Sequence, residues 1–297
     1  MVFLKNVVVL GKQMISMCMG FGCNCAGVVG CRIISSPRER LIAIITNNFV
    51  PCNGRFPILI TVSTIFVGSI FNGFSASIIS TFLILIVLII SISITLLISK
   101  LLSKTLLKGM PSSFILELPP YRKPLFGKII IRSTLNKTLS ILGRAIVVAA
   151  PAGLVIWILS NIGINGESLL TILANFLDPL ASLMGLDGYI LTGFIIGMPA
   201  NEIVIPVMLM AYTKATGLID IESTAEIGNI LYANGWTILT VINVMLFTIM
   251  HFPCSTTLLT IKKETNSFKW TFISFLIPTV CGIIVCMTTT LIYNIFV

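Results

Sequence analysis

Long apolar runs separated by short polar or basic stretches dominate this sequence. Phe82 to Ser99 is uncharged and apolar apart from serines and one threonine. With its neighbours it is long enough to cross a bilayer, which takes roughly 20 apolar residues. Candidate spans occupy residues 58–74, 78–99, 145–159, 231–253 and 270–293. The pattern predicts an all-α polytopic membrane protein.

Two apolar stretches near the start are too interrupted to be simple spans. Residues 13–34 contain four glycines, and Asn24 adds a polar side chain at the same point. Glycine costs about 1 kcal/mol in a helix interior relative to alanine, although it also permits close helix packing in membranes. Residues 41–57 end in the turn signal Pro-Cys-Asn-Gly at 51–54. We predict a broken helix in the first stretch and a half-helix ending in a turn in the second.

The segment 193–206, GFIIGMPANEIVIP, holds Glu202, the only acidic residue in any long apolar run. An ionisable group at membrane depth costs roughly 2.5–3.5 kcal/mol, so it usually faces a cavity, a partner or an ion. Pro199 and Pro206 bracket Glu202 and remove backbone donors, which lipid does not tolerate unless the freed groups face protein or water. We predict a broken or re-entrant transmembrane helix over residues 189–212. Glu202 is then either an ion-binding group or a paired structural carboxylate.

The charged residues indicate topology rather than nucleic-acid binding. The 297 residues are 56% hydrophobic and 10% charged, with net charge +9 and mean hydropathy +1.07, whereas soluble domains carry about 25% charged residues. Lys and Arg stand at the ends of apolar runs, and no soluble basic domain is present to hold a nucleic acid. The positive-inside rule places residues 100–144 and 261–269 in the cytoplasm and the acidic stretches 161–187 and 213–230 outside.

These assignments agree only if residues 189–212 dip into the membrane and return. A full crossing would move the acidic stretch 213–230 inside and the basic stretch 261–269 outside. A span over 172–186 would also restore the parity, but Asp178-Pro179 argues against it. The proline-rich stretch 109–124 predicts a loop or surface strand, followed by an amphipathic helix over 125–144 in the headgroup layer.

The eight cysteines do not form a disulfide framework or a structural zinc motif. They are Cys18, Cys23, Cys25, Cys31, Cys52, Cys254, Cys281 and Cys286. Most lie in or beside apolar segments rather than in loops, and Cys23-Asn24-Cys25 is not one of the paired CxxC motifs of zinc sites. In a membrane span a cysteine usually acts as a small hydrophobic residue. We expect this of Cys18, Cys281 and Cys286, and regard Cys25 and Cys31 as packing residues.

Four motifs, in order, resemble the membrane region of the B-type ferrous-iron transporters (FeoB). They are MGFGCNCAGVVGCRIISSPRERLIAIITNNFVPCNGRFP (19–57), LELPPYRKP (116–124), GFIIGMPANEIVIP (193–206) and HFPCSTTLLTIKKETNSFKW (251–270). The resemblance covers nearly the whole chain and implies two gate domains whose helices break near mid-membrane. Three parts follow: the remainder of the first gate with two spans (1–99), a cytoplasmic basic and amphipathic linker (100–144) and the second gate (145–297).

The sequence departs from the family pattern in its amino-terminal region. Family members usually begin with a soluble GTP-binding domain, which needs the phosphate-binding motif GxxxxGK[ST]. This chain has no such run, and both of its Gly-Lys pairs lack the upstream glycine and the following Ser or Thr. The earliest membrane helices of the family are also missing. We therefore expect no nucleotide-binding residues, and either another chain that supplies these parts or a truncated product.

The resemblance identifies Cys23 and Cys254 as gate cysteines and implies Fe²⁺ as the transported substrate, with no permanently bound cofactor. Ferrous iron accepts thiolate, imidazole and carboxylate ligands. We predict a metal path through Cys23, Cys254 and Glu202. Further candidate ligands are Asn24, Asn201, Met198, Cys52 and His251. A lone histidine in an apolar segment is more often a core residue, even where, as here, it precedes a candidate ligand by one helical turn.

The implied function is a non-enzymatic ferrous-iron permease in the cell membrane of a bacterium. Implied partners are lipid, a separate GTPase chain and a small accessory iron-transport protein, with a homo-oligomer as a further option. One alternative is a gate-type transporter of Mn²⁺, Zn²⁺ or a nucleoside, although the sulfur pair favours a metal. Another is a truncated fragment that is regulatory or does not transport. An enzyme is the weakest interpretation, because no nucleophile–base pair or hydrolytic metal motif is readable.

Overall fold

A computed structural model describes residues 11–71, 73–105, 127, 131, 139–164, 167–215 and 223–296. The α-helices are α1 (Gly11–Gly22), α2 (Asn24–Gly30), α3 (Pro37–Thr46), α4 (Phe56–Ile70), α5 (Phe74–Lys104), α7 (Leu139–Asn161), α8 (Leu169–Leu183), α9 (Gly188–Ile196), α10 (Val204–Thr213), α11 (Thr224–Ala233), α12 (Ile238–Met250), α13 (Ser255–Thr265) and α14 (Phe268–Phe296). Short 3-10 turns are η1 (Cys31–Ile33), η2 (Asn47–Phe49), η3 (Asn53–Arg55) and η5 (Asn201–Ile203). One antiparallel pair, β1 (Gly163–Ile164) and β2 (Glu167–Ser168), precedes α8.

The helices are long and apolar enough for a multi-pass membrane protein, which confirms the predicted fold class. Among the described residues, four segments could cross a bilayer: Pro37–Ile70, Phe74–Lys104, Ile238–Thr265 and Phe268–Phe296. A fifth arises if α8 and α9, which meet at 110°, are counted as one bent span. In α5 and α14 only 17% and 22% of the apolar window is buried within the described protein. The apolar faces of these two helices are therefore suited to lipid or to other membrane helices.

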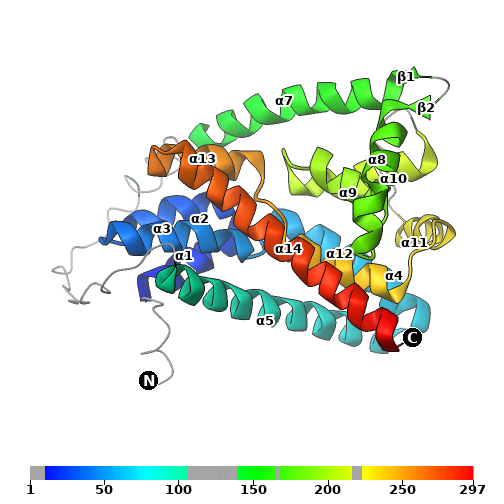
Figure 1. Cartoon of the computed structure of the whole chain (residues 1–297), viewed down its shortest axis with the longest axis horizontal. Helices are drawn as coiled ribbons and strands as arrows, with labels where there is room; N and C mark the ends of the chain where they lie inside the picture. Colours follow the sequence, from blue (N-terminus) through cyan, green and yellow to red (C-terminus); the bar gives the residue numbers. More distant parts are fainter. Residues whose placement is uncertain are drawn as a thin grey trace.

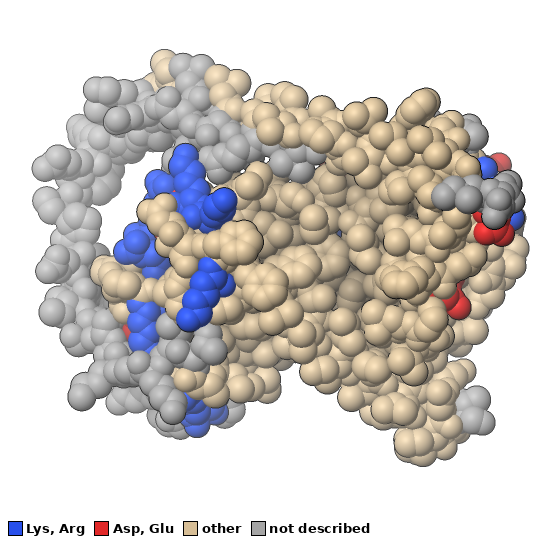
Figure 2. Space-filling view, turned by 45° about the horizontal axis from the view of Figure 1, so that its top comes forward, with Lys and Arg blue, Asp and Glu red and all other residues tan. Residues whose placement is uncertain are grey.

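The described chain has a basic end and an acidic end. Figure 1 shows α7 along one side and α5 along the other, with α14 crossing between them. Helices α1 to α3 and α13 lie at one end, and α8 to α11 lie at the other. Figure 2 shows Lys and Arg gathered at the first end, and Asp and Glu mainly at the opposite end. This separation is the one expected for cytoplasmic and external faces under the positive-inside rule.

The predicted helix breaks are present. Helix α1 ends at Gly22 and α2 begins at Asn24, so the first break falls at Cys23. Helix α3 gives way to a turn at Pro51–Cys52 before α4 begins, as expected for a half-helix. Residues 197–203 interrupt the segment between α9 and α10. A proline disfavours helical backbone in the residue before it, which explains why two of these breaks contain one.

The sequence analysis argued from Asp178-Pro179 against a membrane segment over residues 172–186, but helix α8 runs through this pair and then meets α9 at a sharp bend. The placement of residues 161–187 outside the membrane stays a prediction. Pro179 removes one backbone hydrogen-bond donor, and a helix continues past a proline only where other contacts stabilise it. Here the Asp178 carboxylate accepts a hydrogen bond from the backbone N–H of Gly188 at 2.9 Å, which joins α8 to α9.

Other sequence predictions differ in extent or lie outside the described residues. The expected external loop 213–230 contains the start of α11, and α7 begins earlier than the predicted span at 145. The predicted loop 109–124, and most of the predicted amphipathic helix 125–144, lie outside the described residues. The division of the chain into parts at 99 and 144 stays a prediction.

Gly188 allows the close crossing of α8 and α9. A Cβ atom at this position would collide with the backbone carbonyl oxygen of Ala174 in α8. Asp187 precedes it as the N-cap of α9, and its side chain accepts the Ile190 N–H at 2.7 Å. The bend therefore depends on a residue without a side chain next to a residue that caps the helix.

We predict that Gly188→Ala lowers the thermal stability of the protein in detergent. The added methyl group must push two backbones apart, and overpacking of this kind costs typically about 1–3 kcal/mol. Gly153→Ala in α7 is the matched control, because a methyl group added there would meet no other segment of the described chain within 4 Å. Equal melting temperatures for the two variants would show that the crossing is not tight.

Candidate metal path

Three cysteines occupy the same structural position, the N-cap of a helix that restarts after a break. Cys23 precedes α2, Cys52 precedes η3 and Cys254 precedes α13, each with extended backbone. None of the three thiols makes a capping hydrogen bond to its helix. Ser, Thr, Asp and Asn are preferred there because their oxygen accepts a backbone N–H. A cysteine loses that stabilisation, which leaves its sulfur free for another role.

The turn at Cys52 lies against the break between α9 and α10. The side-chain nitrogen of Asn201 is 3.9 Å from the sulfur of Cys52, and both residues are buried. Next to them, a Cβ atom on Gly54 would lie 3.0 Å from Oε1 of Glu202. Gly54 thus leaves space for the Glu202 side chain, which is exposed in the described structure. The two breaks bring sulfur, amide and carboxylate groups together.

His251 contacts the same group of residues from the end of α12. Its Nδ1 lies 3.1 Å from the carbonyl oxygen of Phe247 and 2.9 Å from that of Thr248. Because carbonyl oxygens only accept, Nδ1 carries the proton and Nε2 keeps a lone pair. Metal-binding histidines are commonly held in this way, with the other ring nitrogen donating to a backbone carbonyl. The Nε2 atom lies 3.3 Å from Oδ1 of Asn201, so two hydrogen-bond acceptors face each other. Rotation of the Asn201 amide would present its NH₂ group to Nε2, and a cation bound between the two atoms would attract both.

Arg55 is a site residue that the sequence analysis missed. Its side chain is 0% exposed and donates to four carbonyl oxygens, those of Asn48, Ile249, His251 and Phe252, at 2.9 to 3.4 Å. Three of these carbonyls belong to the end of α12 and the turn before Cys254. Its signal in the sequence was a single arginine at a break between two apolar segments.

The missing N–H groups of the prolines explain these contacts. In a continuous helix the carbonyl of Ile249 would accept from residue 253, which is a proline and has no N–H. Arg55 donates to that carbonyl at 3.2 Å instead. Likewise, the carbonyl of Asn47 loses a donor at Pro51 and accepts from the Val50 N–H at 3.1 Å and the Asn24 amide at 3.3 Å. At these two prolines the carbonyl that loses its donor is thus satisfied by a specific neighbouring group.

The first break is built around a buried asparagine, Asn47, which was also missed. Its side chain donates to the backbone carbonyl of Asn24 at 3.1 Å. Cβ atoms on Gly20 and Gly27 would lie 2.7 and 2.6 Å from its Oδ1, so both glycines make room for it. Asn24 is buried, and its amide is used in holding Asn47 and Val50. Asn24 therefore has a structural role here, beside its predicted role as a ligand.

Helices α2 and α13 lie side by side with the same direction. The Cys25 thiol of α2 is 2.9 Å from the hydroxyl of Thr260 in α13. Further along, Arg32 in η1, just after α2, forms a two-pronged ion pair with Glu264 of α13 at 2.7 Å. The residue numbers rise together in both helices, so their first turns lie toward the same end. The breaks at Cys23 and Cys254 precede those first turns. Cys25, expected only to pack, is thus a contact between the two halves of the chain.

The predicted ligands do not form one closed site. Among the described residues, no three His, Cys, Asp or Glu side chains lie close enough together to hold a metal ion. Cys23 is exposed and Cys254 is half-buried, 3.1 Å from the hydroxyls of Thr256 and Thr257. Met198 contributes through its backbone, because its carbonyl accepts the N–H of Ser255 at 2.9 Å. The assignment of these residues as ligands stays a prediction.

We predict that Arg55→Lys is strongly destabilising. Lysine has one compact ammonium and cannot reproduce the planar fork of donors. At least one buried carbonyl loses its partner, at a cost of about 1.5–3 kcal/mol for a bond to a charged group. The matched control is Arg32→Lys, because that side chain is 61% exposed and surface pairs contribute only about 0–1 kcal/mol. Thermal unfolding in detergent distinguishes them, and an Arg55→Lys variant as stable as the control would contradict this account.

Comparison with known proteins places these features in a family. Residues 83–135 match the family described as "Ferrous iron transport protein B C terminus", and residues 142–268 match the one described as "Nucleoside recognition", or Gate. The Fe(2+) transporter FeoB of Staphylococcus aureus (strain MSSA476) is 29% identical over 91% of this chain and 39% of its own length. That of Methanocaldococcus jannaschii is 26% identical over 96% of this chain and 42% of its own length.

The chain thus spans 39% to 42% of the length of these curated relatives. No solved structure matches it. The two family matches follow one another along the chain, and the relatives align with nearly the whole of it. The chain therefore carries the FeoB C-terminal and Gate regions and corresponds to the membrane part of the B-type ferrous-iron transporters that it matches.

Proposed function

We propose that this chain forms the ion-conducting part of a permease for Fe²⁺ in the cell membrane. The observation that carries the proposal is the placement of Cys23, Cys52 and Cys254 at helix restarts with no capping bond. The relatives are named as Fe(2+) transporters. Cysteine sulfur suits a borderline cation such as Fe²⁺ better than it suits Mg²⁺ or Ca²⁺, which prefer oxygen.

Open, dispersed ligands fit transport better than storage. An ion that crosses a membrane must bind well enough to lose water and weakly enough to leave. Glu202 is an exposed carboxylate, whereas Cys52 and His251 are buried behind it. We propose that Fe²⁺ exchanges water for the Glu202 carboxylate and cysteine sulfur between the gates. Movement of the broken helices then releases it inward.

Arg55 acts in this scheme as a positioning residue rather than as a ligand. A guanidinium repels a cation, so Arg55 is not a metal ligand. Its positive charge instead faces carbonyl oxygens at the end of α12, where the helix dipole is negative. It holds the turn at Cys52 against the turn at Cys254, so that the two sulfurs belong to one rigid unit. Substitution of Arg55 is therefore expected to change both gates together.

Nucleotide energy would come from another polypeptide in this proposal. The sequence contains no phosphate-binding GxxxxGK[ST] run, and the relatives are much longer than the chain. The partners we propose are a GTPase chain and a small accessory iron-transport protein, with self-association as a further option.

The proposal predicts that Cys23→Ser and Glu202→Gln each abolish Fe²⁺ uptake. The chain is expressed in cells lacking ferrous-iron uptake, with and without a separate GTPase domain, and radioactive Fe²⁺ is followed under anaerobic, reducing conditions. We expect uptake only with the GTPase, because coupling is external. Cys281→Ser is the matched control, since this half-buried cysteine lies in α14, away from the breaks.

Three results would contradict parts of the proposal. Normal uptake by both variants would contradict the assignment of Cys23 and Glu202 to the metal path. Uptake without the GTPase would indicate a passive gate. No uptake in any arrangement, despite membrane insertion of the wild-type chain, would favour a fragment that does not transport. An excess of Mn²⁺ or Zn²⁺ that competes equally with Fe²⁺ would broaden the substrate class.

A further inference from the structure

A groove between α13 and α14 begins at Ser255, beside the candidate metal path, and extends along α13 to Lys262. It has a volume of about 390 Å³ and is lined by Ser255, Leu258, Leu259, Lys262, Phe268, Thr271, Phe272 and Phe275. Pockets of this size that are mostly apolar with a few polar groups are typical ligand sites. We propose that the groove binds one anionic phospholipid, with an acyl chain along its apolar wall and the phosphate at Lys262. This proposal concerns lipid binding and does not depend on iron transport.

The polar groups along the groove favour an acyl chain over a soluble polar ligand. The Ser255 backbone N–H and hydroxyl both lie within hydrogen-bond distance of the Met198 carbonyl, at 2.9 and 3.3 Å. The Thr271 hydroxyl donates to the Ser267 carbonyl at 3.0 Å. Neither hydroxyl proton is left for a ligand. Phe275 is stacked on Phe252 with ring centroids 5.4 Å apart, which fixes that wall of the groove.

The basic side chains at the open end have no acidic partner within the described residues. Lys262 lines the groove, and Lys263 and Lys269 flank it in sequence. Glu264, between them in sequence, is paired with Arg32 instead. An anionic headgroup would therefore supply the missing countercharge. Basic pockets between transmembrane helices on the cytoplasmic side are known to suit such headgroups.

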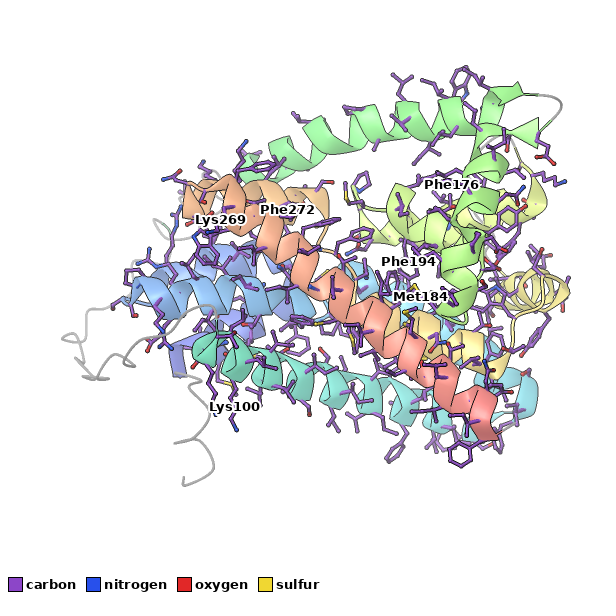
Figure 3. The ribbon with its side chains drawn as sticks, in the orientation of Figure 1. Lys100, Phe176, Met184, Phe194, Lys269 and Phe272 are labelled. Carbon is purple, nitrogen blue, oxygen red and sulfur yellow. The ribbon has the colours of Figure 1, made fainter. Side chains whose placement is uncertain are left out.

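The depth of the groove also matches a lipid. Figure 2 shows Lys and Arg gathered at one end of the molecule, and α13 lies at that end. Figure 3 shows Lys269 and Phe272 together near the start of α14, with Lys100 apart from them on α5. From Lys262 the groove extends to Ser255, deeper in the membrane by about two helical turns. The basic side chains at one end of the groove match an anionic headgroup, and the apolar wall matches an acyl chain.

The test uses the full chain in detergent and measures lipid retention by native mass spectrometry. Phosphatidylglycerol is compared with phosphatidylcholine carrying the same acyl chains, and with glycerol 3-phosphate as a headgroup without chains. We expect preferential retention of phosphatidylglycerol and no competition by glycerol 3-phosphate. Lys262→Gln should weaken phosphatidylglycerol binding roughly fivefold, as one basic side chain near an anionic headgroup contributes about 1 kcal/mol. Lys269→Gln should weaken it in the same direction.

Two further variants separate groove binding from general attraction. Lys100→Gln removes an exposed lysine from the same end of the molecule but outside the groove, and should leave retention unchanged. Leu259→Trp places a larger side chain at an exposed groove position and should weaken both lipids. The proposal is overturned if the two lipids are retained equally, if Lys100→Gln acts like Lys262→Gln, or if glycerol 3-phosphate displaces the lipid. A lipid-free dimer that buries the groove would also overturn it.

Discussion

A broken helix in a membrane is stable only if its freed backbone groups find partners inside the protein. This constraint accounts for the buried side chains of Arg55 and Asn24 at two of the breaks. Pro253 removes a donor to the Ile249 carbonyl, and Arg55 replaces it. Pro51 removes one to the Asn47 carbonyl, which the Asn24 amide and the Val50 N–H replace. The polar side chains at these positions therefore support the backbone first.

The same contacts join the two halves of the chain. Arg55 and Cys52 lie between α3 and α4, yet they contact the end of α12 and Asn201, about 150 to 200 residues further along the chain. The paired helices α2 and α13 add a second connection through Arg32 and Glu264. Because the turn at Cys52 and the turn before Cys254 share the side chain of Arg55, a change at one turn alters the environment of the other.

The sequence predicts the existence of the breaks because prolines and glycines have strong local effects on backbone. It also locates Glu202, since an acidic residue in an apolar run is costly and therefore conspicuous. It does not predict α8, because Asp178-Pro179 is typical of a helix stop. The contact between Asp178 and the Gly188 N–H, which holds the bend together, is set by folding in three dimensions. The gate cysteines are identified by their resemblance to known transporters alone.

The sequence could not predict the partners of the buried polar groups. Arg55 and Asn47 escape notice because their roles depend on segments far away in the chain. Arg55 contacts carbonyls almost 200 residues further along, and Asn47 fits between two glycines of other helices. Similarly, the sequence favours Cys23 over Cys52 as a ligand, although Cys52 is the one beside Asn201. Local patterns identify where a helix breaks, whereas packing determines what occupies the break.

The central claim is that cysteine sulfur at the helix restarts binds Fe²⁺ during transport. X-ray absorption at the iron edge, on anaerobic protein loaded with one equivalent of Fe²⁺, reports directly on atoms bonded to the metal. The account predicts sulfur bonded to iron in the wild-type protein, reduced in Cys23→Ser or Cys254→Ser and unchanged in Cys281→Ser. Iron bonded only to oxygen or nitrogen in the wild-type protein would contradict it.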